Sequence, residues 1–218
     1  MWIILPVKHL RDSKSRLKDI LSDEQRWQFS YLMVMDTLQT FCSSDHVHGV
    51  TMISSDQSLS RLAKQYHVEF ILTDKDSGYS KDAMDAINAL PKNGVDKIAI
   101  IPTDLPQLSH HDLELLDNAH EQGVTLCVAE KDGGTNALVF TPPLAIPLLF
   151  GLDSCKKHQQ AAKDRGVAEK IVQISGLQRD IDQSDDLCWL FERSSGGKAW
   201  QYIKTTFKDT VLAPQVHE

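Results

Sequence analysis

Short, unbroken runs of apolar residues alternate along the chain with longer segments in which apolar and polar residues are mixed. We predict a strand in each apolar run, within residues 2–5, 48–55, 68–74, 96–104, 124–130, 137–143 and 170–175. The mixed segments predict helices over 22–41, 58–67, 80–92, 109–123, 154–166 and 198–207, with a loop and a further helix within 179–197. Strands that are apolar throughout indicate a mostly parallel sheet with helices on both faces.

Several residues mark where these elements should begin and end. Ser22 and Ser109 precede helical segments and are typical N-caps. Gly123 is expected to end the helix that follows Ser109, because glycine is common at helix C-termini. Pro6 is expected to stop the first strand, because it has no N–H to donate. The helix over 22–41 is predicted to bury one face, made of Trp27, Leu32, Met35 and Leu38.

The pattern as a whole fits one α/β domain. No repeat, low-complexity block or linker interrupts the 218 residues, so we expect one domain over 1–207 and a loose tail over 208–218. Ligands of such sheets bind beyond the carboxyl ends of the strands. The polar segments at predicted strand ends are therefore the candidates for chemistry, and they are 6–8, 54–56, 73–74, 103–104 and 180–182.

Composition and charge argue against some classes of partner. The chain is 41% hydrophobic and 24% charged, with a net charge of −7. An acidic protein is poorly suited to general binding of nucleic acid or anionic membrane. The cysteines are widely spaced without a CxxC pair, which argues against a zinc or disulfide framework. No apolar run has the character of a signal peptide or the length of a membrane span, so we expect a cytoplasmic protein.

Carboxylates at two strand ends are candidate metal ligands. Asp104 follows the apolar run 98–101 and lies between two prolines that restrict its backbone. It could hold Mg²⁺, which prefers oxygen ligands, or could simply cap the following turn. Asp180 and Asp182 are separated by one residue, so in an extended segment they point to the same side. A cation between them would relieve their repulsion, but a solvated acidic loop is the simpler interpretation.

Basic residues follow the first predicted strand. Lys8 comes directly after it, and Lys14 and Arg16 lie in the same polar segment. Cations at this edge of the sheet could bind a triphosphate, although basic residues in surface loops are common. Neither GxGxxG nor GxxxxGK[ST] occurs, so dinucleotide-binding and P-loop sites lack their main support.

Two further segments have features of a binding site. In the segment 131–136, two glycines permit close approach of the backbone to a ligand, and Thr135 and Asn136 add a hydroxyl and an amide. An ordinary turn between two strands explains the same residues more simply. Gly151 and Ser154 precede a predicted helix whose N-terminus could bind an anion, and a serine cap is the alternative.

The order of these segments resembles the phospholactate guanylyltransferase family, which acts in the biosynthesis of coenzyme F-420. The segments that carry the resemblance extend from about Ile3 to Tyr202 and are LPVK, KSRL, DAINAL, IPTDLPQL, GGTNAL, FGLDSCKKHQQAAKDRG and RDIDQSDDL. The resemblance implies a single Rossmann-like, GT-A-like nucleotidyltransferase domain. It also implies transfer of GMP from GTP to a phosphorylated three-carbon acid, which is 2-phospho-L-lactate, phosphoenolpyruvate or 3-phospho-D-glycerate, with release of pyrophosphate.

The resemblance further implies roles for individual residues. Catalysis would depend on Asp104 and Lys8, and Mg²⁺, expected as two ions, would be held by Asp104, Asp180 and Asp182. GTP would be bound by Pro6, Lys8, Lys14, Arg16, Asn88 and Pro102. The acid would be bound by Thr135, Asn136, Gly151 and Ser154. The resemblance also suggests a homodimer.

The implied reaction agrees with the residues that are present. A phosphate oxygen of the acid would attack the α-phosphorus of GTP in line, and this needs no protein nucleophile. No Ser-His-Asp or Cys-His arrangement can be recognised from spacing. Three alternatives stay open: a sugar-phosphate or molybdopterin-type nucleotidyltransferase, a glycosyltransferase of the same fold, and a non-catalytic nucleotide-binding protein.

Overall fold

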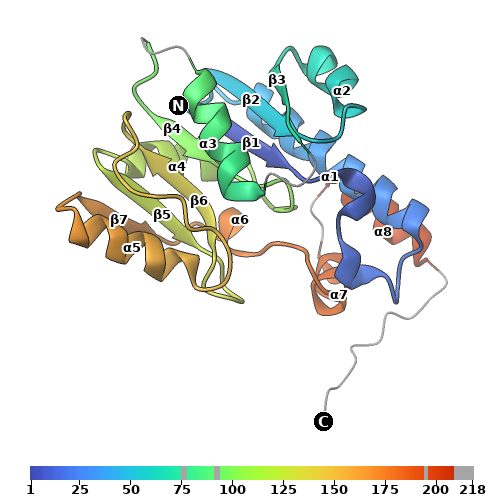
Figure 1. Ribbon diagram of the computed structural model, residues 1–218. Helices are drawn as coiled ribbons and strands as arrows, with labels where there is room; N and C mark the ends of the chain where they lie inside the picture. Colours follow the sequence, from blue (N-terminus) through green and yellow to red (C-terminus); the bar gives the residue numbers. More distant parts are fainter. Residues whose placement is uncertain (75–77, 91–93, 194–195, 209–218) are drawn as a thin grey trace.

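Figure 1 shows the computed structural model, which describes residues 1–74, 78–90, 94–193 and 196–208. Seven strands form one sheet in the order β3-β2-β1-β4-β6-β5-β7. They are β1 Trp2–Val7, β2 Gly49–Ser54, β3 Glu69–Leu72, β4 Ile98–Ile100, β5 Val124–Val128, β6 Thr135–Phe140 and β7 Glu169–Val172. Only β6 runs antiparallel to its neighbours in this sheet, which confirms the mostly parallel sheet.

Helices cover both faces of the sheet. They are α1 Asp23–Cys42, α2 Leu59–Tyr66, α3 Tyr79–Ala89, α4 His110–Ala119, α5 Ser154–Asp164, α6 Ser175–Gln178, α7 Ser184–Glu192 and α8 Lys198–Thr206, with 3-10 turns η1 Leu10–Asp12 and η2 Ser15–Leu17. In Figure 1, α3 and α5 lie in front of the sheet, whereas α1 and α4 lie behind it. No helix of the described residues combines the length and apolar character of a membrane span.

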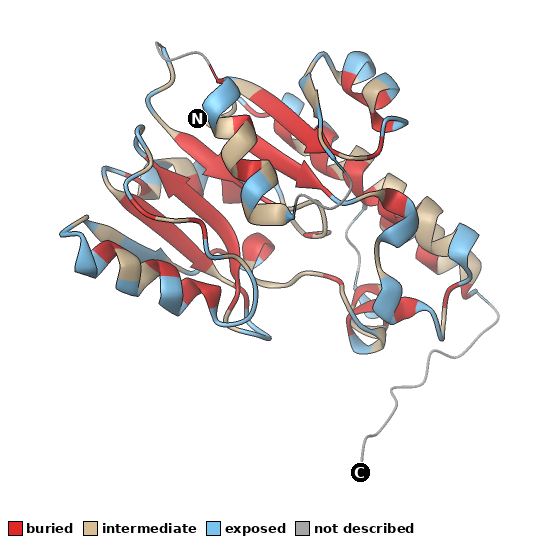
Figure 2. Ribbon diagram, viewed as in Figure 1, coloured by how far each residue is buried: buried red, intermediate tan, exposed pale blue. Residues whose placement is uncertain are grey.

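Burial on two faces explains the unbroken apolar runs. In β1, the side chains of Ile3 and Leu5 pack into the cluster beneath α1 and α4, whereas Ile4 packs with α3 and α5. Successive side chains of a strand point to opposite faces, so a strand covered on both sides must be apolar at every position. Figure 2 shows the resulting layer of buried strands between partly exposed helices.

The expected end of the first strand at Pro6 is wrong, because β1 continues to Val7. Trp2 donates its N–H to Lys97 and Ile4 accepts from Ile101, so the even-numbered residues of β1 direct their backbone groups toward β4. β4 ends at Ile100, so no ladder partner faces Pro6 on that side. A missing N–H therefore costs the sheet nothing at this position.

The expected helix end at Gly123 is also wrong, because α4 ends at Ala119. The next residue, His120, is extended and buried between the hydroxyls of Thr125 and Thr141. Gly123 instead forms the turn into β5 with φ +70°, and a Cβ there would lie 2.1 Å from the carbonyl oxygen of Ala168. Only glycine fits this approach of two backbones.

The predicted buried face of the first helix is confirmed in part. Leu38 is buried, and Trp27 and Met35 are partly buried against the same cluster, whereas Leu32 packs against a different one. One side of α1 packs on the sheet, and the other packs against α7 and α8 in a separate cluster that includes Phe29 and Met33. Helices α7 and α8, which come from the C-terminal part of the chain, pack against a second face of α1. A prediction of one buried face therefore could not describe this helix fully.

Other expected boundaries differ in smaller ways. The polar segment 9–17 that follows the first strand contains η1 and η2. The strand expected over 170–175 ends at Val172 and leads into the short helix α6. The helix predicted over 80–92 is observed over Tyr79–Ala89, and residues 91 and 92 lie outside the described residues. The expected loose tail, apart from Lys208, also lies outside them.

The buried His120 should make stability depend on pH. Burial, followed by the charge of Lys97, lowers the pKa of His120 to about 4. The unfolded chain takes up this proton near the ordinary histidine pKa of about 6.5. Protonation therefore favours the unfolded state between these values, and stability that is full above pH 6.5 is lost as the pH falls. We expect His120→Gln to be less stable than wild type at pH 7, with the difference shrinking by roughly 1–3 kcal/mol at pH 4.5.

Urea unfolding at the two pH values measures this difference. His111→Gln is the control, since the His111 side chain is 72% exposed. A difference between His120→Gln and wild type that stays constant with pH would contradict the expectation.

Candidate functional site

The carboxyl ends of β1 and β4 open onto two adjoining cavities of about 90 and 270 Å³. The start of β6 reaches the same edge, because β6 runs antiparallel to β4. Both cavities are lined by Lys8, Tyr79, Pro102, Asp104 and Asp182. The structure therefore brings together side chains from strand ends that are far apart in the sequence.

Three carboxylates converge in this region. Asp104, Asp180 and Asp182 each offer an oxygen, and these oxygens all lie within 4.8 Å of one another. The segment with Asp180 and Asp182 is held in position by the Ile181 N–H, which donates to the Asp104 carbonyl at 3.0 Å. Burial, followed by the charges of Asp104 and Asp182, raises the pKa of Asp180 to about 6. The cluster thus has more negative charge than the isolated protein easily accommodates.

The ammonium of Lys14 partly neutralises this charge. Its Nζ lies 2.7 Å from Asp104 Oδ2 and 3.0 Å from Asp182 Oδ1, and its side chain is only 7% exposed. Burial acts to lower the pKa of Lys14, but the two carboxylates outweigh it and raise the pKa above its usual range. The exposed Arg16 adds a longer contact of 3.5 Å to Asp182. The cluster therefore attracts cations, and its all-oxygen donor set fits a hard divalent ion such as Mg²⁺.

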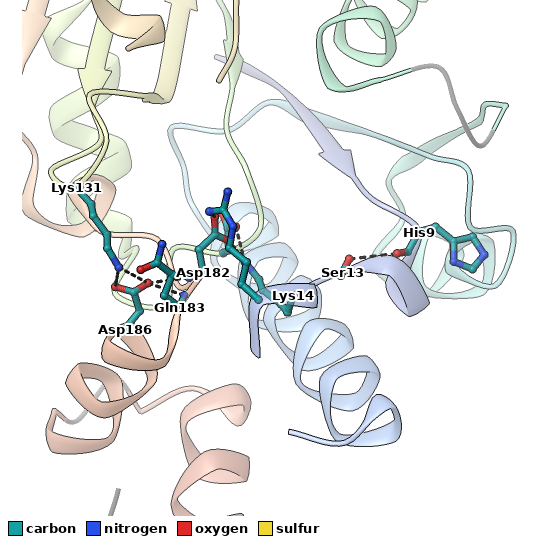
Figure 3. A network of polar contacts seen from close by, with 9 residues as sticks. His9, Ser13, Lys14, Lys131, Asp182, Gln183 and Asp186 are labelled. Carbon is teal, nitrogen blue, oxygen red and sulfur yellow. Dashed lines mark hydrogen bonds and ion pairs between the residues drawn. The ribbon is translucent and has the colours of Figure 1, made fainter. Parts of the chain in front are cut away.

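A buried carboxylate behind the cluster holds the loop in place. Asp186 on α7 is fully buried and accepts the backbone N–H groups of Asp182 and Gln183 at 3.0 and 2.8 Å. Lys131 and Arg179 approach the same carboxylate, at 3.2 and 3.5 Å. Figure 3 shows Asp186 between Lys131 and this loop, with Lys14 meeting Asp182 on the other side. The acidic first turn of this helix thus orients Asp182.

The other end of the larger cavity has neutral donors. Its lining includes Thr135, Asn136 and Gly151. The side-chain nitrogen of Asn136 is buried and has no hydrogen-bond partner among the described residues. A buried amide without a partner is costly unless a ligand satisfies it. Ser154 is fully buried behind Thr135 and donates to its hydroxyl at 3.0 Å.

The structure does not bring Asn88 to this region. Asn88 lies near the end of α3 and lines a separate, mostly apolar cavity with Pro142 and Pro143. Tyr79, the first residue of α3, is the one that reaches Asp104. Asn88 lies nine positions after Tyr79 in this helix, which corresponds to about 13 Å along its axis. The expected Asn88 contact with the nucleotide therefore lacks structural support.

The remaining predicted residues lie at the cavities in different ways. Pro6 and Lys14 line the smaller cavity, and Lys8 and Pro102 line both. Arg16 lines neither cavity but contacts Asp182, which lines both, at 3.5 Å. Among the other strand-end segments, Asp56 is used structurally, since it accepts hydrogen bonds from Leu10 and Ser58.

Tyr79 and His158 also contribute to this region, although no role was predicted for either from the sequence. Burial and the charge of Asp104 raise the pKa of Tyr79, whose ring packs edge-on against Phe150. No local pattern distinguishes Tyr79. His158 lies four residues after Ser154 in the helix predicted over 154–166, and this spacing, which places both side chains on one helical face, was a usable signal.

Comparison with known sequences identifies the family. A profile of the family described as "Guanylyl transferase CofC like" matches residues 1–211. The chain belongs to this family. This confirms the resemblance drawn from the order of the motifs.

Three relatives of this CofC-like chain have different acids in their names. Phosphoenolpyruvate guanylyltransferase of Roseiflexus castenholzii is 35% identical and covers 88% of this chain and 89% of its own. 3-Phospho-D-glycerate guanylyltransferase of Colwellia psychrerythraea is 32% identical over 85% and 88%. 2-Phospho-L-lactate guanylyltransferase of Methanobrevibacter smithii is 25% identical over 92% and 88%.

A solved structure agrees with the fold of the CofC-like chain. A nucleotidyl transferase from Methanothermobacter thermautotrophicus superimposes with a TM-score of 0.62, covering 94% of this chain and 99% of that one. The two sequences are 15% identical, so the likeness concerns the fold alone. It confirms the predicted nucleotidyltransferase fold.

Proposed function

We propose that this protein transfers GMP from GTP to the phosphate of a small phosphorylated three-carbon acid and releases pyrophosphate. The observation that carries the proposal is the convergence of Asp104, Asp180 and Asp182 in a cavity that continues to the donors Thr135 and Asn136. The cavity has one end suited to a cation and a triphosphate and another suited to a small anion. Family membership and the names of the relatives support guanylyl transfer.

The charges that line the larger cavity support a role for a metal ion. Among the described residues, its lining includes the carboxylates of Asp104, Asp132, Asp180 and Asp182 but only one ammonium, that of Lys8. Two anionic substrates would be repelled by such a surface unless cations bind with them. Asp104, Asp180 and Asp182 would hold Mg²⁺, which when bound neutralises phosphate charge and helps to align the reacting groups.

The chain's own groups account for binding and orientation. Lys8 and Arg16 are exposed cations at the edge of the cavities and would bind the phosphates of GTP. Pro6 and Pro102 form rigid walls beside them. Thr135 and Asn136 would donate hydrogen bonds to the acid, and Gly151 leaves room beside them. The acceptor phosphate is already ionised near neutral pH, so the protein needs no general base.

A product screen tests the proposal. Purified protein is incubated with GTP, Mg²⁺ and each of 2-phospho-L-lactate, phosphoenolpyruvate and 3-phospho-D-glycerate, and products are identified by mass spectrometry. We expect at least one acid to give a guanylylated product together with an equal amount of pyrophosphate. Product with sugar phosphates alone would favour the sugar-nucleotide alternative, and GTP binding without turnover would favour a non-catalytic protein. Omitting Mg²⁺ tests the metal requirement.

The position of Lys14 gives a further expectation about the cation. Lys14→Gln removes the ammonium that lies between Asp104 and Asp182, so the metal-free protein should lose about 2 kcal/mol of stability. This is less than for a fully buried pair, since the Asp182 side chain is 42% exposed. Mg²⁺ should then raise the melting temperature of the variant more than that of wild type.

Thermal unfolding with and without Mg²⁺ measures this difference. Lys18→Gln is the control, because Lys18 is an exposed lysine just after the same segment. An equal response to Mg²⁺ in wild type and Lys14→Gln would argue against cation binding by these carboxylates.

The proposal also includes a homodimer and a cytoplasmic location. Light scattering of the purified protein tests the homodimer by measuring its mass in solution.

A further inference from the structure

His158 lies buried behind the end of the cavity that contains Thr135. Its side chain is fully buried on α5, one helical turn after Ser154. Its Nδ1 lies 3.0 Å from Thr135 Oγ1, and its Nε2 lies 2.8 Å from the backbone nitrogen of Leu149. The ring thus connects β6, α5 and the segment that precedes α5.

The partner of Nε2 determines which ring nitrogen carries the proton. A backbone N–H can only donate, so Nε2 of His158 accepts from Leu149 and is unprotonated. The neutral ring then carries its proton on Nδ1, which donates to Thr135 Oγ1. Burial, followed by the charge of Lys157, lowers the pKa of His158 to about 4, so the ring is neutral at physiological pH.

The Thr135 hydroxyl can therefore donate its proton only toward a group other than His158 and Ser154. Its oxygen accepts from His158 Nδ1 and from Ser154 Oγ, which uses both lone pairs. Its own proton points to neither of them, and Thr135 lines the cavity. Asn136 lies in the same lining, and its amide nitrogen has no hydrogen-bond partner within the described part of the chain. An anionic oxygen bound there would accept from both groups.

We propose that His158 is a positioning residue, which holds the Thr135 hydroxyl as a donor toward an anionic oxygen of the acceptor acid. The inference rests on the proposed guanylyl transfer and adds to it the group that orients the acid-binding donor. His158 lines neither cavity, so it acts through Thr135. The ring also packs edge-on against Phe150, 5.1 Å between centroids, and so supports the cavity wall beside Gly151.

Two substitutions separate the two hydrogen bonds of the ring. In His158→Gln, the amide oxygen of the glutamine can reach the position of Nε2 and still accept from the Leu149 N–H, but the donor to Thr135 is lost. His158→Asn keeps an amide donor near the position of Nδ1 but loses the acceptor for Leu149. We expect His158→Gln to raise the KM for the acid by about tenfold or more, the size of one hydrogen bond to a charged group. The KM for GTP should stay unchanged, and His158→Asn should lie closer to wild type.

Substitutions of Thr135 provide an independent check. Thr135→Val should raise the KM for the acid as His158→Gln does, and the double variant should be no worse than Thr135→Val alone, because both act through one hydroxyl. Thr135→Ser keeps the hydroxyl and should raise the KM for the acid less than Thr135→Val does. An unchanged KM for the acid in His158→Gln, or equal changes for acid and GTP, would overturn the proposal.

The tautomer can be measured without any substrate. Nitrogen-15 NMR of the ligand-free protein should show His158 protonated at Nδ1 and unprotonated at Nε2 at neutral pH, and the reverse would overturn the proposal whatever the activity. If wild type transfers GMP but His158→Gln is normal, only this inference fails. If wild type transfers GMP to none of the three acids, the proposed function fails and this inference fails with it.

Discussion

Asp104→Asn is expected to lower pyrophosphate release from GTP on the order of 10²–10³-fold, the usual loss when one electrostatic contact to developing charge is removed. Under the proposed function, Asp104, like Asp182, belongs to the metal cluster and lines both cavities. Asn retains the shape of the side chain but removes its charge, so both metal binding and substrate alignment should suffer. Single-turnover measurement of pyrophosphate, with saturating GTP and acid, gives the change directly.

The fold should tolerate this substitution. Asp104 is one of the carboxylates that raise the pKa of Asp180, so removing its charge relieves repulsion while Lys14 keeps Asp182 as a partner. Asp96→Asn is the matched control, because Asp96 is an exposed residue near the opposite end of β4 and should leave the rate unchanged. Turnover near the wild-type rate in Asp104→Asn would remove Asp104 from the proposed metal site.

Asp186→Asn is expected to lower the free energy of unfolding by about 3 kcal/mol, as when one partner of a buried ion pair is removed. The Asp186 side chain is fully buried and accepts from two cations and two backbone N–H groups. The asparagine side chain has no charge, and its NH₂ group would face the cations and N–H groups that donate to Asp186. Because Asp186 also holds the Asp182 backbone, Mg²⁺ binding and turnover should weaken as well.

Urea unfolding compares this variant with a neighbour on the same helix. Asp185→Asn is the control, since Asp185 is exposed, and it should change the free energy of unfolding by less than about 0.5 kcal/mol. If Asp186→Asn were as stable as Asp185→Asn, the buried carboxylate would not stabilise the loop, and the positioning of Asp182 would need another explanation.

Much of the sheet could be predicted from local pattern. Each observed strand lies largely within a predicted apolar run. In the inner strands burial on both faces favours apolar side chains at successive positions, whereas the edge strands β3 and β7 are only partly buried. Boundaries were less predictable where a distant segment decides them. Pro6 is tolerated in β1 because β4 is short, and α4 ends early because His120 is held by Thr125 and Thr141. These partners cannot be recognised within a short window of sequence.

Part of the site could also be predicted from the order of the strands. Carboxylates and cations at strand ends were expected to meet, since parallel strands present their carboxyl ends at one edge. Asn88 was expected in this region from family resemblance, but α3 carries it away from Asp104. No role was predicted for Asp186, because its burial depends on Lys131 and Arg179, which only the fold brings to it.

The amino-acid sequence by itself determined the alternation of strands and helices, the parallel character of the sheet and the location of Asp104 at a strand end. These properties depend on periodicity and on residues close together in the chain. The tertiary structure alone decided that Lys14 lies against Asp104, 90 residues away, and that His158 orients the Thr135 hydroxyl. Such contacts depend on how packed elements direct individual side chains, and neither spacing nor composition specifies that direction.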